Sequence, residues 1–303
     1  MSRSVVLAVL SLLTAVSAAS AGPVNAPVVG GSMVPPGKWP DAVAILGPSG
    51  SCTGTLIAPD VVLTAGHCTN IQPTEIVANT TNYNGSGGQR IAIESITAYP
   101  NYREKFDVAV IVLVSPVTGV VPRSVAGHCT FSGFADETMV HLVGFGLTDT
   151  AGVGANTALR EAMAPVLDAT CSGGNGCREA VAPQGEFVAG GSGGDSCFGD
   201  SGGPVYLDTA RGPVLVAAVS RGLDDSATPC GGGGIYVRTD KVLAWVEHTT
   251  GRQVAKDCPD ESTDAAASDD SSVGCSSSRG GASAALMLLV IGSLGLARRR
   301  RVR

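Results

Sequence analysis

The apolar residues of this chain fall into short runs that Gly, Pro, Asn and Asp repeatedly interrupt. Runs of three to seven residues occur at 42–46, 54–57, 61–64, 90–96, 108–114, 139–143, 205–207, 214–220 and 235–237. Short apolar segments separated by turn residues are typical of strands in a barrel or a sandwich. Glycine supplies 41 of the 303 residues, against an average share of about 7%. The pattern predicts an all-β protein and excludes a helical bundle.

One segment departs from this pattern. Residues 240–250 carry Val242, Trp245 and Val246 at the i, i+3, i+4 spacing of a helix. The sequence predicts a short helix there, close to the end of the folded body.

The amino terminus has the features of an export signal. Arg3 precedes a run, 5–16, that is apolar except for Ser11 and Thr14, and Ala19-Ser20-Ala21 follows. A positive start, a short apolar run and an Ala-x-Ala site are typical of a secretory signal peptide. The alternative is a buried core helix, which explains neither the charge nor the cleavage site. We expect residues 1–21 to be removed and the protein to be exported.

The carboxyl terminus holds a second apolar stretch, 282–297, followed by the arginine cluster 298–301. A Ser, Ala and Asp-rich segment, 254–280, precedes it and predicts a solvated acidic tether. About 20 apolar residues make a comfortable membrane helix, so this stretch is short. With Gly274-Cys275-Ser276, residues 281–303 resemble a MYXO-CTERM sorting tail.

That resemblance implies a processing enzyme that cuts near Cys275 and display on the outer surface of a Gram-negative cell. The alternative is a plain membrane anchor whose arginines remain on the cytoplasmic side. Under either interpretation, the exported protein is found at the cell surface or outside the cell. At the cell surface, its tail attaches it to a membrane.

Nine cysteines in an exported chain predict a disulfide framework. If Cys275 belongs to the tail, eight cysteines remain for the body. Zinc is the competing use of clustered cysteines. Cys171 and Cys177 have no histidine or second cysteine pair near them in the sequence, so their spacing argues against zinc. We expect no metal and no other cofactor.

The charge excludes one further class of protein. The net charge is −6, and six of the arginines lie at the two extreme ends, so the body is more acidic still. Nucleic-acid-binding proteins normally present a basic surface. We expect no nucleic-acid partner.

Three short motifs carry the chemistry: Leu63-Thr64-Ala65-Gly66-His67-Cys68, Phe106-Asp107-Val108-Ala109-Val110 and Gly199-Asp200-Ser201-Gly202-Gly203-Pro204. Each motif alone could belong to a structural loop. We expect the other histidines, His128, His141 and His248, to have structural roles. Together, in this order, they resemble the chymotrypsin and trypsin family of serine endopeptidases, over residues 28–253. The resemblance implies two antiparallel β-barrels with the active site between them.

The chemistry of the three side chains agrees with the resemblance, whose mechanism is the standard template for triad catalysis. A serine hydroxyl needs an adjacent base to become a nucleophile. His67 can take the proton of Ser201, and Asp107 can orient the imidazole. The glycines around Ser201 allow a tight turn that directs the backbone N–H groups of Gly199 and Ser201 at one oxyanion.

The resemblance also implies disulfides. It pairs Cys52 with Cys68, Cys171 with Cys177, and Cys197 with Cys230. Leu207 replaces the family cysteine that follows the serine, so Cys129 lacks its usual partner, and we predict a bond from Cys129 to Cys258.

The substrate pocket follows from the same resemblance. Asp195, six residues before Ser201, matches the trypsin branch, in which this carboxylate binds an Arg or Lys side chain of the substrate. Gly222 and Gly234 match glycines of the pocket wall. Ser220 lies in the substrate-binding strand, where Arg221 replaces the usual Trp. The alternative is that Asp195 only caps a turn in a neutral pocket.

Activation is the last implication. Val28-Val29-Gly30-Gly31 resembles the new amino terminus of the family, whose ammonium pairs with the carboxylate before the nucleophile, here Asp200. Pro27 precedes Val28, so a protein that cuts after Arg or Lys does not activate itself. We expect a separate activating protease to remove the propeptide 22–27; the alternative is that the ammonium is not used.

The sequence therefore predicts an exported serine endopeptidase that acts on proteins or peptides, after Arg or Lys. The alternative is a catalytically silent homologue that serves as a binding module at the surface.

Overall fold

The computed structural model describes residues 28–172, 174–191 and 193–258. The predicted signal peptide 1–21, the propeptide 22–27, Cys275 and the tail 281–303 lie outside the described residues.

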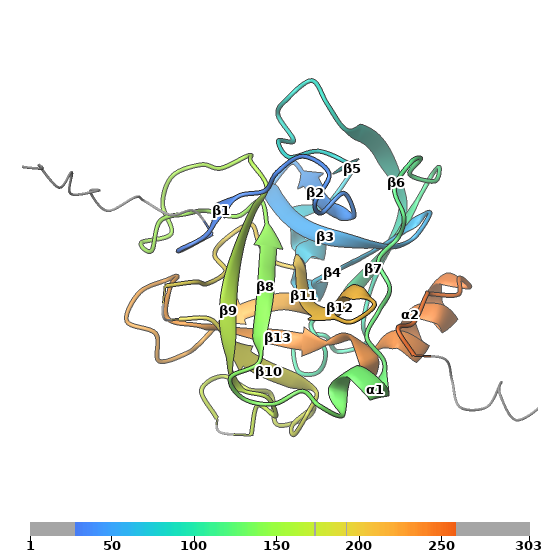
Figure 1. The fold of residues 1–303 in the computed structure, drawn as a ribbon. Helices are drawn as coiled ribbons and strands as arrows, with labels where there is room; N and C mark the ends of the chain where they lie inside the picture. The colour runs from blue at the N-terminus through green and yellow to red at the C-terminus, as the bar shows by residue number, and fades with distance from the viewer. Residues whose placement is uncertain (1–27, 173, 192, 259–303) are drawn as a thin grey trace, which may run out of the picture. The chain divides into compact units, whose positions relative to one another are not determined.

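The first half of the described chain forms a closed antiparallel barrel (Figure 1). Its strands are β2 (Ala42–Gly47), β3 (Gly50–Ala58), β4 (Val61–Thr64), β5 (Glu75–Ala78), β6 (Gln89–Ala98) and β7 (Ala109–Leu113). They follow the order β2-β3-β4-β7-β6-β5, and pairing of β2 with β5 closes the barrel. Closure leaves no unpaired strand edge around the barrel wall.

The second half forms another antiparallel barrel from β8 (Met139–Gly144), β9 (Arg160–Asp168), β10 (Glu186–Ala189), β11 (Pro204–Thr209), β12 (Gly212–Gly222) and β13 (Gly234–Arg238). Strand β8 pairs with both β9 and β11 and so closes it. The short strand β1 (Ser32–Met33) adds to β9. The predicted pair of antiparallel barrels is confirmed.

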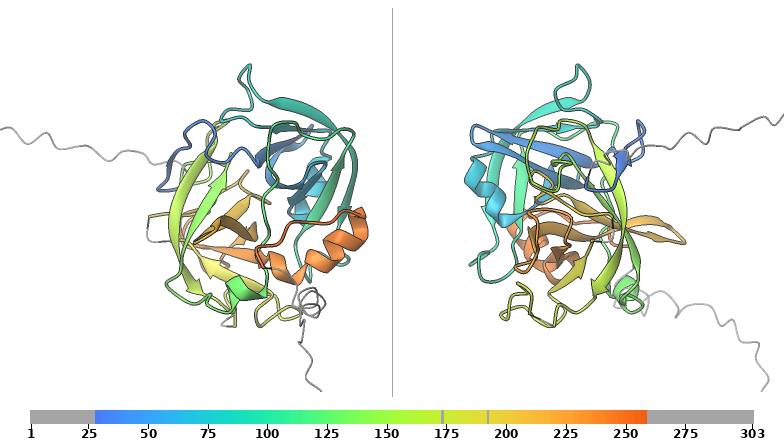
Figure 2. Two further views of the ribbon diagram at one scale, coloured as in Figure 1. Left: turned by 45° about the vertical axis from the view of Figure 1, so that its right-hand side comes forward. Right: turned by 90° about the vertical axis from the view of Figure 1, so that its left-hand side faces the viewer.

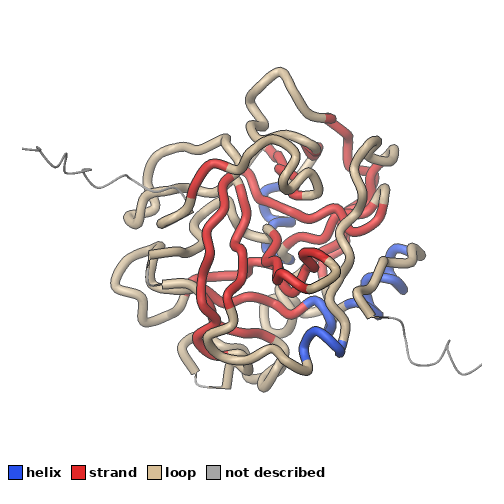
Figure 3. Tube along the Cα trace, viewed as in Figure 1, coloured by secondary structure: helices blue, strands red, loops and turns tan. Residues whose placement is uncertain are grey.

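Helices are few and short (Figure 3). They are the 3₁₀ helices η1 (Gly66–Ile71) and η2 (Thr239–Lys241), and the α-helices α1 (His128–Phe131) and α2 (Leu243–Thr250). The predicted C-terminal helix is confirmed as α2, preceded by η2. The expectation of a single helical segment was wrong, because η1 and α1 are too short for a helical period to be visible in the sequence.

The sequence missed strands β5, β9 and β10. In β9 the buried residues Ala162, Ala164 and Val166 alternate with more exposed ones, and Met163 and Leu167 are 45% and 43% exposed. This period of two marks a strand with one face on the core. Pro165 and the two charged residues at the start of β9 interrupt the apolar residues, so the strand does not appear as a continuous apolar run.

Residues 254–258 belong to the folded body, which corrects the predicted start of the tether at 254. Val254 and Cys258 are 6% and 8% exposed, Lys256 forms a bridge with Val125, and Cys258 is bonded to Cys129. Burial of Val254 and the disulfide hold this segment, so the body extends at least to Cys258.

Helix α2 packs on the first barrel although it follows the second in sequence (Figure 2). The rings of Trp245 and Tyr99 lie 5.0 Å apart, and this contact ties the two halves together. None of the helices in the described residues is long and apolar enough to cross a membrane.

Candidate active site

His67 and Asp107 are held together by two hydrogen bonds. His67 lies in η1, directly after β4, and Asp107 lies just before β7, the strand paired with β4. The Nδ1 of His67 is 2.8 Å from Oδ2 of Asp107, and the backbone N–H of His67 donates to Oδ1 at 2.9 Å. The aspartate therefore fixes both the ring and the backbone of the histidine.

Asp107 is 2% exposed, and its surroundings favour the ionised carboxylate. Burial by itself raises the pKa of a carboxyl group, but hydrogen bonds from His67 and Ser220 and the charge of His67 together lower the pKa of Asp107 below its ordinary value. The Ser220 hydroxyl donates to Oδ2 at 2.7 Å. Since Ser220 lies on β12, it joins the second barrel to the aspartate of the first. Sequence reasoning assigned Ser220 to substrate binding, and the structure adds this contact.

Ser201 lies in the turn before β11 and lines one cavity of about 620 Å³ together with His67, Asp107 and Asp195. Among the described residues no hydrogen bond joins its hydroxyl to His67. Catalytic hydrogen bonds often tighten only when substrate is bound. The fold thus brings residues from three distant parts of the chain to one cavity between the barrels.

The turn before Ser201 presents two free donors. Gly199 has a φ of 96°, a left-handed conformation that glycine adopts without strain. In the described part of the chain, the backbone N–H groups of Gly199 and Ser201 donate to no protein acceptor. Two such groups flanking a hydroxyl are suited to bind an oxyanion.

Thr53 holds this turn, and sequence reasoning missed it. Its hydroxyl donates to the carbonyl oxygen of Gly199 at 2.8 Å and accepts from the N–H of Phe145 at 3.1 Å. Its own N–H donates to the carbonyl oxygen of Ser201 at 3.0 Å. A buried threonine of β3 in the first barrel therefore fixes the carbonyls, and hence the N–H groups, of a loop in the second.

Asp195 is a buried carboxylate that lines the cavity and is 2% exposed. It accepts hydrogen bonds from the N–H groups of Ser196, Gly231 and Gly233 at 2.8 to 2.9 Å. Burial raises the pKa of Asp195 despite these bonds. In the described residues no cation lies within ion-pair distance of it.

The two glycines predicted for the pocket wall differ in their position. Gly222 lines the cavity, and a Cβ built on it meets nothing closer than 3.9 Å. Gly234 pairs with Gly222 in the sheet, and its own Cβ would lie 2.9 Å from the Tyr236 hydroxyl. The cavity wall itself includes Gly233 instead. Of the two predicted glycines, Gly222 therefore borders the cavity, and Gly234 is its partner in the neighbouring strand.

Asp200 is a second buried carboxylate without a cation in the described part of the chain. Its two oxygens accept from the N–H groups of Cys197 and Gly146 at 2.9 and 2.8 Å. Burial raises the pKa of Asp200 to about 7. Val28 is 1% exposed, but no contact in the described residues joins it to Asp200.

The Arg221 guanidinium is hydrogen-bonded to other groups of the protein. Its guanidinium forms two hydrogen bonds with the Glu186 carboxylate, at 2.7 and 2.8 Å, and a third to the Ser220 hydroxyl at 3.0 Å. The Glu186 side chain is 1% exposed. The ion pair with Glu186 therefore offsets the charge that Arg221 brings to the substrate-binding strand.

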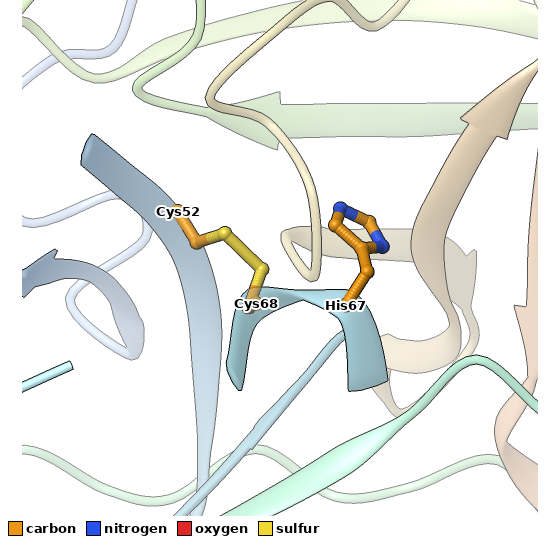
Figure 4. Close-up of side chains that lie close together, drawn as sticks. All are labelled: Cys52, His67 and Cys68. Carbon is orange, nitrogen blue, oxygen red and sulfur yellow. A yellow bond between two sulfur atoms is a disulfide. The ribbon is translucent and has the colours of Figure 1, made fainter. Parts of the chain in front are cut away.

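The structure contains disulfides Cys52–Cys68, Cys129–Cys258, Cys171–Cys177 and Cys197–Cys230. Cys68 is bonded to Cys52 of β3, and the His67 ring points away from that bond (Figure 4). The sulfur atoms of these disulfides are not thiolates and so cannot serve as thiolate ligands of a metal. The bond therefore secures the turn that presents His67.

Comparison with known proteins agrees with this geometry. Residues 28–246 match the family described as Trypsin. Chymotrypsin-like elastase family member 1 of Bos taurus is 31% identical over 251 residues, covering 74% of this chain and 90% of the relative. The protein named Trypsin of Saccharopolyspora erythraea is 33% identical over 222 residues, covering 70% and 92%.

Among solved structures, the secreted serine protease VesC from Vibrio cholerae aligns with a TM-score of 0.59 and 22% identity. The alignment covers 73% of this chain and 48% of that one, and at this identity it supports the fold alone. With the family match and the relatives above, it follows that this chain belongs to the trypsin family and is a serine endopeptidase.

Proposed function

We propose that this protein is exported and hydrolyses peptide bonds after Arg or Lys, with Ser201 as nucleophile, His67 as general base and Asp107 as the group that orients His67. The observation that carries the proposal is the shared cavity, with the His67–Asp107 pair and Ser201 beside one buried, uncompensated carboxylate, Asp195.

The proposed reaction runs through an acyl-enzyme. Ser201 Oγ attacks the peptide carbonyl carbon while His67 Nε2 takes its proton, and the N–H groups of Gly199 and Ser201 bind the oxyanion. His67 gives the proton to the leaving amine. A water molecule then repeats the sequence on the ester and frees Ser201. Asp107 stays ionised, which agrees with its lowered pKa.

Asp195 supports the preference for a basic residue. The names of the relatives include both an elastase and a trypsin, so the pocket of this chain must decide. A buried carboxylate that lacks a cation is costly. A substrate guanidinium or ammonium would provide the missing charge, whereas an apolar side chain would leave it unpaired.

Asp200 supports activation by cleavage before Val28. Its raised pKa reflects an anion that burial disfavours. A freed Val28 ammonium beside it would form a buried ion pair and order the adjoining Gly199 turn. Because Pro27 precedes the cleavage point, the activating protease would be another enzyme. The amino-terminal mass of the protein recovered from the medium and from the cell surface tests this: activity should accompany a terminus at Val28.

The cellular location rests on the sequence of the two ends. The signal-like residues 1–21 support export, and residues 281–303 support attachment to the cell surface with a tail-processing enzyme as partner. The carboxyl-terminal mass of the same sample tests it: cleavage near Cys275 supports the sorting tail, and an intact tail supports a membrane anchor.

Steady-state hydrolysis of matched peptides tests the activity. The processed protein should cleave peptides with Arg or Lys at the cleavage position, cleave those with Ala or Glu far more slowly, and lose all turnover as Ser201→Ala. A folded, processed protein that binds peptides but cleaves none would instead support a silent homologue. Equal cleavage after Ala and Arg would overturn the basic preference.

A further inference from the structure

The cavity that Asp195 lines is also lined by arginines. Arg103, Arg178 and Arg221 all line it. They come from the segment before β7, the segment before β10, and β12. A substrate side chain that reaches Asp195 therefore leaves the rest of the peptide close to a cationic wall.

The three arginines differ in how their charge is met. Arg221 is neutralised by Glu186 through two hydrogen bonds. Arg178 donates from Nη1 to the carbonyl oxygens of Tyr102 and Lys105, both at 2.6 Å. Arg103 is exposed, and its guanidinium lies 5.6 Å from the Tyr102 ring centre. In the described residues neither Arg103 nor Arg178 forms an ion pair with a carboxylate.

The electrostatics at Arg178 are unfavourable for a cation. Burial lowers the pKa of Arg178, and the charge of Arg221 lowers it further. The charges of Asp107 and Glu186 raise the pKa of Arg178, but by less than burial and Arg221 lower it. The carboxylates of Glu104, Glu179 and Asp224 on neighbouring loops do not line the cavity. An anion supplied from outside would stabilise this part of the site.

Strand β12 offers the substrate an edge along the cavity. Its pairing with β11 ends at Pro204–Ala218, whereas its pairing with β13 continues to Gly222–Gly234. One edge of residues 220–222 is therefore unpaired, and those residues line the cavity. An extended peptide can add to such an edge through main-chain hydrogen bonds.

A peptide on that edge has a defined order of side chains. With a basic side chain at Asp195 and its carbonyl at Ser201, the residues before the cleaved bond run along 220–222 toward Arg221. The hydrogen bonds of Arg221 to the carbonyl oxygen of Gly176, and of Arg178 to that of Tyr102, connect this strand to the loops that carry Arg178 and Arg103. Side chains of those preceding residues would come near Arg103 and Arg178, the two guanidiniums that form no ion pair in the described residues.

We propose that the enzyme selects acidic segments that precede a basic cleavage residue, with Arg103 and Arg178 as the groups that bind the acidic side chains. This inference rests on the proposed function and adds the class of substrate. Complementary charge selects among partners and speeds their association.

The test uses peptides with Arg fixed at the cleavage position and with Glu, Gln or Lys at each of the three preceding positions. We expect kcat/KM to follow Glu, then Gln, then Lys, by about threefold for each step at a contacting position, as for partly exposed ion pairs. The preference should weaken as salt is raised, because salt screens exposed charges.

Variants identify the residues responsible. Arg103→Gln should remove the preference for Glu at one position and leave the arginine requirement intact, whereas Arg211→Gln, which alters an exposed arginine outside the cavity, should keep the full preference. Arg178 also holds two carbonyls, so Arg178→Gln can disturb the loops. Arg178→Lys keeps the charge without the planar group and should retain the preference if charge is what matters.

The outcomes separate this inference from the proposed function. Equal or reversed rates for Glu and Gln peptides, or an acidic preference only after the cleaved bond, would overturn the inference while cleavage after Arg continued. A preference unchanged in Arg103→Gln and Arg178→Gln would also overturn it. Absence of any hydrolysis, with Ser201 unreactive, would mean that the proposed function has failed.

Discussion

The Thr53 hydroxyl of the first barrel donates to the carbonyl oxygen of Gly199 in the second, at 2.8 Å. Together with the bond from the Thr53 N–H to Ser201, this contact spans the interface on which the site is built. The N–H groups that would bind the oxyanion belong to the same turn, so its orientation depends on a residue that touches no substrate.

Thr53→Val should therefore lower kcat with little change in KM. The variant keeps the shape of the side chain but leaves the Gly199 carbonyl without its donor, and we expect a loss of about tenfold, equal to roughly 1.4 kcal/mol. Thr55→Val in the same strand is the control, because the Thr55 hydroxyl forms no hydrogen bond in the described residues. Equal effects of the two changes on kcat would contradict a special role for Thr53.

Asp195→Ser should reduce kcat/KM for arginyl peptides by at least about a hundredfold, since removing one partner of a buried ion pair costs about 3 kcal/mol or more. Cleavage after small neutral residues should persist. Asp225→Ser, an exposed carboxylate of the loop before Cys230, should leave both rates unchanged. Retained arginine preference in Asp195→Ser would show that another group binds the basic side chain.

Asp200 should make the unprocessed chain less stable as pH rises. Its pKa is raised to about 7 in the folded state, above the ordinary 3.8. Between these two pH values Asp200 is protonated in the folded state and ionised in the unfolded state. Its contribution to the free energy of unfolding is therefore full below about pH 4 and is lost near pH 7. Its size is on the order of 4 kcal/mol.

Denaturant unfolding across this pH range measures the effect. In unprocessed protein inactivated by Ser201→Ala, the stability relative to the same protein with Asp200→Asn should fall as pH rises from 4 to 7. A difference that is constant with pH would show that Asp200 is already neutralised by a cation before processing.

Arg221 and Glu186 should behave as one unit in stability. Arg221→Met leaves the Glu186 carboxylate buried without its cation, and we expect the free energy of unfolding to fall by about 3 kcal/mol. Glu186→Gln should cost a comparable amount, and the double variant clearly less than the sum. Denaturant unfolding of the four proteins gives the coupling energy, and strict additivity would refute the pairing.

The pattern of short apolar runs predicted an all-β barrel or sandwich, and the family resemblance carried by the three motifs predicted two barrels. His67, Asp107 and Ser201 lie in short strings whose order along the chain is itself informative. The role of Thr53 could not be predicted in this way, because its partners Gly199 and Phe145 lie 146 and 92 residues away. A threonine inside a strand carries no local sign of such contacts.

A feature of the sequence indicates the ion pair between Arg221 and Glu186, although it was not used for a prediction. Glu186 begins the apolar run Phe187-Val188-Ala189, and Arg221 follows the apolar strand 214–220. Two opposite charges at the ends of buried strands favour a mutual ion pair, since an unpaired buried charge is costly. The start of the tether was misplaced for another reason: the segment near Cys258 is polar, and a long-range disulfide holds it.

The reactivity of Ser201 tests the central claim most directly. Processed protein is treated with a fluorophosphonate, and the adduct is located by mass spectrometry of its peptides. A single adduct on Ser201 is expected, with its rate of formation reduced by about a thousandfold or more in His67→Ala. An adduct on another residue, or peptide hydrolysis by a protein whose Ser201 stays unmodified, would contradict the assignment of this serine as the nucleophile.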